Sequence, residues 1–252
     1  MDDQAETAAM RAARGGGRGG AGMAAATLFD SRVWILRPLL GMRREALRDV
    51  LRAAGQAWID DPSNERETSE RVRVRKVLGD AEILRLAAEA ATAGARRQIA
   101  SDAAAAWLSR AEPGENGSVR LPRDAFGSGD PVLPMRALLA TVGGTPHLPA
   151  EAATQALIAQ LWGGRSGALA RALVKVSRSG FTIGRERRGG QPDTRAGLGA
   201  IAPWAAFLPG FDVGLRNAVA RLVGVAAVPA SPMQAGLRLS RDTLRTEPRA
   251  TA

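Results

Sequence analysis

Three carboxylates stand within the first six residues of the chain, at Asp2, Asp3 and Glu6. If this segment is helical, side chains three and four positions apart share one face. The three carboxylates can then converge on one bound cation, and oxygen ligands of this kind suit Mg²⁺. An acidic first turn is also what the positive end of a helix dipole favours. The spacing alone allows both a catalytic cluster and a helix terminus stabilised by charge.

A glycine-rich run follows the acidic residues and extends from residue 14 to residue 22. Glycine lets backbone amides approach a ligand closely, and the guanidinium groups of Arg14 and Arg18 add strong donors. Backbone amides and guanidinium groups together suit a phosphate or a nucleotide backbone, with Arg14, Gly15 and Gly17 as the candidate residues. Glycine repeats are also common as flexible linkers, so this alternative stays open.

Three arginines follow an Asp-Asp-Pro-Ser-Asn turn further along the chain. On a helix Arg71 and Arg75 lie four residues apart and share a face, whereas Arg73 points roughly the other way. Such a face can hold RNA phosphates without reading the base sequence. The alternatives are a solvated basic face and, for Ser63 and Asn64, a simple helix cap.

Composition narrows the function classes. With 252 residues the chain exceeds one typical domain, so two folded units and a tail are expected. A net charge of +10 suits an RNA partner, although 33 of the 35 basic residues are arginine, which genome composition can also explain.

The absence of cysteine excludes disulfides and thiolate metal sites, and the single histidine, His147, leaves little for imidazole catalysis. No apolar run approaches the ~18 residues of a membrane span, so a cytoplasmic protein is expected.

Hydrophobic periodicity predicts the elements that must position these residues. Helices are expected over residues 2–14, 44–54, 65–78, 80–110, 132–142, 149–162 and 215–228. Short strands are expected over residues 33–36 and 119–121, and a hairpin over residues 174–176 and 181–183. Helix 44–54 carries one apolar stripe and should pack on the sheet.

Several segments in one register resemble a known family. They are residues 2–23, 36–40 and 58–64, and in order and spacing they resemble the tRNA(Ile)-lysidine synthases, ligases of the PP-loop ATP pyrophosphatase superfamily. The family's acidic motif, His-x-x-Asp-Asp-x-x-Glu-Thr, is matched by Asp2, Asp3, Glu6 and Thr7, with the chain starting after the histidine. The family's ATP-binding string, Ser-Gly-Gly-x-Asp-Ser, does not occur in these residues. The resemblance therefore implies the rear portion of the enzyme, from a truncated gene or a misplaced start.

The fold that the resemblance implies is α/β with a helix-rich second domain. Residues 1–78 would be the rear part of a PP-loop parallel sheet, and residues 79–190 a mostly helical domain that binds tRNA or substrate and contains the hairpin. Residues 191–252 form a tail without an assigned role.

The activity that the resemblance implies consumes ATP to adenylate the wobble cytidine of tRNA(Ile) with a CAU anticodon, after which lysine attacks the same carbon. Asp2, Asp3 and Glu6 are the implied catalytic residues, either with Mg²⁺ on Asp3 and Glu6 or with the carboxylates holding the lysine ammonium group. ATP and Mg²⁺ would serve the complete enzyme, with neither bound tightly by this chain. The expected partners are the tRNA, free lysine and a second copy of the chain, and no membrane.

The residues implied to contact RNA or phosphate come from two segments. The tRNA-binding set is Asp61, Ser63, Asn64, Arg71, Arg73 and Arg75, and the phosphate-binding set is Arg14, Gly15 and Gly17. The chain departs from the family at two positions, since Gly16 stands where a hydroxyl residue is usual and Val72 where asparagine is usual. Contacts that the family makes through a hydroxyl group and an asparagine at these two positions are therefore not expected in this chain.

A function of a different class is a non-catalytic tRNA-binding remnant, or one half of a split enzyme. A parallel sheet without its first strands exposes unpaired edges, which hinders folding as well as catalysis. We therefore expect that these residues alone do not turn over ATP, and an unstable fold is the third alternative.

Overall fold

The computed structural model describes residues 1–15, 20–29, 33–61, 68–145, 147–186 and 213–224. The helices are α1 (Asp2–Ala12), α2 (Arg44–Ala53), α3 (Glu70–Val77), α4 (Asp80–Leu108), α5 (Val132–Gly143), α6 (Glu151–Trp162) and α8 (Val213–Val223). The strands are β1 (Ala26–Phe29), β2 (Val33–Leu36), β3 (Glu112–Pro113), β4 (Val119–Pro122), β5 (Gly167–Leu169), β6 (Ala172–Val176) and β7 (Gly180–Arg185). None of the described helices is both long and apolar enough to cross a bilayer.

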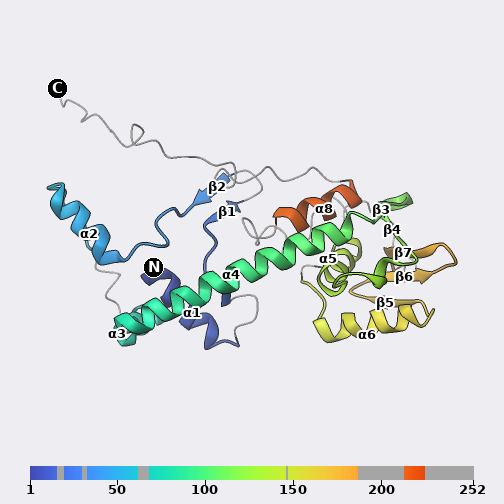
Figure 1. The fold of residues 1–252 in the computed structure, drawn as a ribbon, viewed down its shortest axis with the longest axis horizontal. Coiled ribbons are helices and arrows are strands. Elements are labelled where there is room, and N and C mark those ends of the chain that lie inside the picture. Colours follow the sequence, from blue (N-terminus) through green and yellow to red (C-terminus); the bar gives the residue numbers. More distant parts are fainter. Residues whose placement is uncertain (16–19, 30–32, 62–67, 146, 187–212, 225–252) are drawn as a thin grey trace, which may run out of the picture.

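The long helix α4 runs from the amino-terminal helices α1 and α3 to the part of the molecule that contains α5 and strands β3 to β7 (Figure 1). Near its start, Leu86 and Ala90 pack against Ala5 and Ala8 of α1 in a small apolar cluster. Alanine at these positions lets the two helix backbones approach closely while keeping both segments helical. The other half of α4 ends in Trp107 and Leu108, which belong to the main core, so a single helix fixes both clusters.

The main core lies between helices and a five-stranded antiparallel sheet with strand order β3-β4-β7-β6-β5. The predicted hairpin is confirmed, since β6 pairs with β7 and Val174 faces Ile183. Alternate residues of these strands are buried, as expected for a sheet with one covered face. Leu138 and Leu139 of α5 are fully buried against this face.

Most predicted elements occur where the hydrophobic pattern places them. The strand over residues 33–36 and the helices near residues 2–12, 44–53 and 80–108 all form. Helix 65–78 begins at Glu70, and residues 62–67 lie outside the described part of the chain. Within the tail, α8 packs against α4 and places Leu215 and Leu222 in the main core.

The observed fold is α/β with helix-rich regions, as predicted, but two expectations need correction. Helix α2 buries no residue, and Val50 on its apolar stripe is 62% exposed, so the expectation that it packs on the sheet is wrong. The adjoining β1–β2 ribbon has only two strands and offers no broad face for it. Among the described strands every pair is antiparallel, so the parallel pairing that the resemblance implied is not seen there.

Candidate functional site

The amino-terminal helix α1 places its acidic residues against arginines that come from two other helices. Glu6 is buried, with 2% of its side chain exposed. Its Oε2 accepts a hydrogen bond from Arg71 Nε at 2.7 Å, and its Oε1 accepts one from Arg75 Nε at 2.8 Å and one from Arg44 Nη2 at 3.2 Å. One carboxylate therefore binds guanidinium groups from α3 and from the start of α2.

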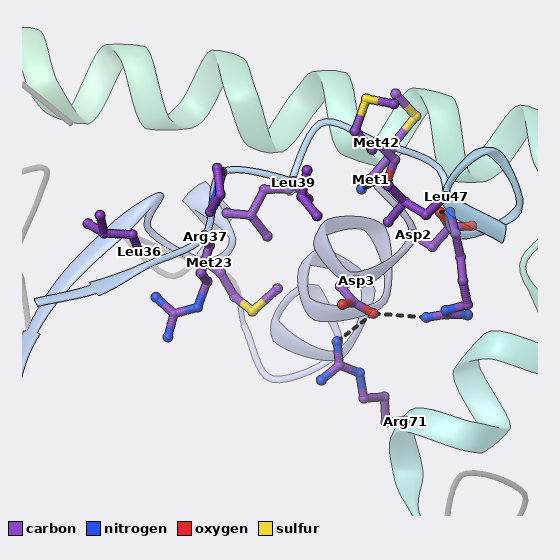
Figure 2. A pocket seen from close by; sticks show the side chains of 13 residues that line it. Met1, Asp2, Asp3, Met23, Leu36, Arg37, Leu39, Met42, Leu47 and Arg71 are labelled. Carbon is purple, nitrogen blue, oxygen red and sulfur yellow. Dashed lines mark hydrogen bonds and ion pairs between the residues drawn. The ribbon is translucent and has the colours of Figure 1, made fainter. Parts of the chain in front are cut away.

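Asp3 lies beside this group but is half exposed to solvent. Its Oδ1 accepts from Arg44 Nη2 at 2.9 Å. The same oxygen forms an ion pair with Arg71 Nη2 at 3.1 Å, marked by a dashed line in Figure 2. Asp3 thus bridges two of the arginines that hold Glu6. Exposed ion pairs are weak and exchange readily, so the contacts of Asp3 are broken more easily than those of the buried Glu6.

Asp2 connects α1 to the start of α2. Its Oδ2 accepts from the backbone N–H of Arg44 at 2.8 Å, and its Oδ1 accepts from Arg43 Nε at 3.2 Å. Arg43 also donates through Nη2 to Asp80 at the start of α4, at 2.6 Å. A carboxylate that binds the first N–H groups of a helix satisfies donors that have no partner within that helix. Asp2 therefore sets the position of α2 relative to α1.

Arginine contacts also set the protonation of these carboxyl groups. Burial by itself raises the pKa of Glu6, but hydrogen bonds from Arg75, Arg71 and Arg44 outweigh it and hold that pKa below its usual value. Burial likewise raises the pKa of Asp2, and the backbone hydrogen bond from Arg44 together with Arg43 lowers it overall. Both groups are therefore firmly anionic at neutral pH and are weak bases.

The arrangement does not fit Mg²⁺ at Asp3 and Glu6. Both carboxylate oxygens of Glu6 already accept hydrogen bonds from guanidinium groups, and Asp3 is bonded to two of the same arginines. A dication would meet their positive charges at close range. Across the described parts of the chain, no group of three or more histidine, aspartate or glutamate side chains is placed to hold a metal ion. The two carboxylates therefore serve as partners of arginine in this structure.

A pocket of about 390 Å³ opens beside the carboxylates (Figure 2). Its apolar lining includes Met23, Leu39, Met42 and Leu47. The charged residues of its lining are Asp2, Asp3, Arg37, Arg44 and Arg71. Such a pocket suits a ligand with an aliphatic stem and a charged end, because the stem is buried while the end finds opposite charges.

The structure brings together only part of the predicted site. Asp2, Asp3, Glu6, Arg71 and Arg75 form one cluster. Arg73 points elsewhere and donates to the carbonyl of Thr68 at 3.2 Å, as helical geometry predicts. Arg14 forms an ion pair with Glu70 at the start of α3, and Gly15, with a φ of +97°, lies in the turn after α1, whose last helical residue is Ala12 rather than residue 14. Asp61 ends a described segment, while Gly17, Ser63 and Asn64 fall outside the described residues.

Sequence reasoning missed Arg43 and Arg44, which contact all three carboxylates between them. One signal was available. Two cations at the start of a helix are disfavoured by the helix dipole, so they indicate an anionic partner from another segment. The acidic residues of α1 are that partner.

Comparison with known proteins assigns the family. Residues 1–82 match the PP-loop domain. Over 92% of its length the chain aligns, at 33% identity, with a tRNA(Ile)-lysidine synthase from Mesorhizobium japonicum and covers 71% of that protein. The chain belongs to the tRNA(Ile)-lysidine synthase family. The corresponding protein of Rhizobium meliloti is 37% identical over 81% of the chain, which spans 48% of that relative. The protein of Hyphomonas neptunium is 54% identical over 31% of the chain.

Membership confirms the resemblance predicted from the sequence. The relatives carry the name of a ligase, and the PP-loop match places the chain in a family of ATP-using enzymes. The individual roles of the site residues are not tested by these alignments, so they stay predictions.

Proposed function

We propose that this chain forms part of the active site and of the tRNA-binding surface of a tRNA(Ile)-lysidine synthase. The reaction would join lysine to C2 of the wobble cytidine in tRNA(Ile) with a CAU anticodon, through an adenylated base formed from ATP. One observation carries the proposal. Arg71 and Arg75, which are predicted to bind tRNA, donate hydrogen bonds to Glu6, which is predicted to be catalytic. The two arginines are 65 and 69 residues away from Glu6 in the sequence.

The pocket suits the lysine substrate. The methylene groups of lysine would lie along Leu39, Met42 and Leu47, and its ammonium group would approach the half-exposed carboxylate of Asp3, with Asp2 beside it. Because the pKa of Asp2 lies below its usual value, this carboxylate would stay anionic beside the ammonium group rather than take a proton from it. The residues here would therefore orient the amine and leave its deprotonation to another group.

The arginines supply the opposite charge. Adenylation releases pyrophosphate, and attack by the amine of lysine then releases AMP, so negative charge develops on phosphate oxygens in both steps. Arg44 and Arg71 border the pocket and would stabilise that charge or the nearby phosphates of the tRNA. Arg14, Gly15 and Gly17 would add phosphate contacts, and Asp61, Ser63, Asn64 and Arg73 further contacts to the tRNA.

A second role applies to these 252 residues by themselves. The Ser-Gly-Gly-x-Asp-Ser string that holds ATP in the family does not occur in them. We therefore propose that the isolated chain binds tRNA without turning over ATP, as a tRNA-binding remnant or one half of a split enzyme would. Release of pyrophosphate that depends on tRNA, measured with the purified chain, would contradict this part of the proposal.

The test of tRNA binding is its salt dependence. Binding of a tRNA(Ile) transcript should weaken as salt rises, and Arg71→Ala should reduce the slope of log K against log salt by about one unit if Arg71 contacts a phosphate. Arg85→Ala is the matched control, because it removes the same charge from an exposed residue of α4 that is paired with Glu82 and Glu89. An equal slope for the Arg71→Ala variant and the unmutated chain would remove this face from the tRNA interface.

A further inference from the structure

Glu6 has more positive partners than its own charge requires. A buried carboxylate needs a cation and hydrogen bonds to offset the loss of water, and one well-placed arginine supplies both. Glu6 instead accepts hydrogen bonds from Arg44, Arg71 and Arg75, at 3.2, 2.7 and 2.8 Å. Even with the charge of Asp3 included, the three arginines exceed by one charge the carboxylates that are bonded to their guanidinium groups. An excess of cations around one buried anion points to a ligand of negative charge outside the cluster.

The three arginines are bonded to a buried carboxylate on one side and are exposed to solvent on the other. Their side chains are 35%, 39% and 32% exposed, whereas Glu6 is 2% exposed. Among the described residues, their bonds to Glu6 and Asp3 engage Nε and Nη2 of Arg71 and Arg75 and Nη2 of Arg44. A guanidinium group has five N–H donors, so each arginine keeps donors that can meet a phosphate.

We propose that Glu6 is a positioning residue that fixes Arg44, Arg71 and Arg75 as one array for binding backbone phosphates of the tRNA. This inference rests on the proposed function. Glu6 would act through the arginines and would touch neither the lysine nor a metal ion. Because the arginines come from two separate helices, a single buried anion at their meeting point is what gives them a common geometry.

The two carboxylates of the cluster then have different roles. Glu6 is buried and fixes the array, whereas Asp3 is half exposed and contacts two of the same guanidinium groups from the solvent side. A phosphate that approaches from solvent can replace Asp3 but cannot reach Glu6. Removal of each negative charge should therefore change tRNA binding in opposite directions.

The experiment measures binding of a tRNA(Ile) transcript to the full 252-residue chain at fixed salt, with three variants that each remove one negative charge. Glu6→Gln should weaken binding by about tenfold, because freed arginines must be ordered when the tRNA binds. Asp3→Asn should tighten binding, since it removes a competing anion and leaves the array in place. Glu82→Gln, on an exposed residue of α4 paired with Arg85, is the matched control and should leave binding unchanged.

The outcomes separate this inference from the proposed function. If Glu6→Gln binds tRNA as tightly as the unmutated chain or more tightly, charge alone governs binding and the positioning role is overturned. If the unmutated chain does not bind tRNA at all, the proposed function fails and the inference fails with it.

A second set of variants applies if Glu6→Gln disturbs the fold. Arg71→Lys and Arg75→Lys keep the positive charge and the buried glutamate, but a lysine cannot bond Glu6 and a phosphate with the geometry of a guanidinium group. These variants should also bind more weakly. Binding equal to that of the unmutated chain would overturn the array.

Discussion

Replacement of Glu6 by glutamine should loosen the packing of α1 while leaving the main core intact. The amide keeps the shape of the side chain but loses its charge, and its NH₂ group faces guanidinium donors instead of accepting from them. Hydrogen bonds to charged groups contribute about 1.5–3 kcal/mol each in mutational series. The three arginines are about one-third exposed and can turn to water, and their contributions are not additive, so a total loss of about 2–3 kcal/mol is expected.

Native-state hydrogen exchange of α1 is the appropriate assay, because global unfolding reports mainly on the larger core. A loss of about 2–3 kcal/mol corresponds to roughly a 30- to 150-fold rise in the opening equilibrium of the protected amides. Mass spectrometry of peptides from α1 would resolve this change, and peptides from α5 should keep their protection. Glu82→Gln serves as the control with an equal charge change. Unchanged protection of α1 in the Glu6→Gln variant would refute the energetic role of the arginine cluster.

The same variant predicts a pH window. Although burial raises the pKa of Glu6, its arginine partners lower it below the usual value of 4.5, so the ionised form favours the folded state. Its contribution is complete above about pH 4.5 and is lost as pH falls further, through the pKa of the folded state. The difference in α1 protection between the unmutated chain and Glu6→Gln should therefore be constant from pH 7 to about 5 and shrink below that range. A difference that grows toward acid pH would contradict the assignment.

Three further predictions concern the scaffold. Gly143→Ala should destabilise the main core by about 3 kcal/mol in urea melts, because the added Cβ would clash with the carbonyl oxygen of Ala170 and the backbone must shift; a neutral result would show that the two backbone segments can separate without cost. Leu138→Ala should cost about 3–5 kcal/mol, seen as a lower urea midpoint at unchanged slope, because this side chain is fully buried in α5. Trp58→Ala should reduce amide protection in α2 alone, by an amount equivalent to about 1 kcal/mol. The centre of the Trp58 ring lies 5.6 Å from Cζ of Arg48 and 5.5 Å from Cζ of Arg52, both in that helix. Equal protection in the variant would show that the ring does not stabilise α2.

The amino-acid sequence by itself determined the local elements and the family. The end of α2 is marked by Gly55, which follows the C-cap of that helix with a left-handed φ of +65°. Alternating apolar residues were enough to predict the hairpin of β6 and β7, and motif order was enough to indicate the PP-loop ligases. These signals are short in range, since helix and strand periods repeat within two to four residues.

Only the tertiary structure decided which charges meet. On the sequence, Glu6 was a ligand for metal or lysine and Arg71 and Arg75 were ligands for RNA, but the packing of α1 against α3 and α4 bonds them to one another. Arg44 joins them because Asp2 binds the backbone at the start of α2 and brings that helix end to α1. Periodicity says which side of a helix a residue occupies, whereas the partner that a buried charge finds depends on contacts between segments far apart in the chain.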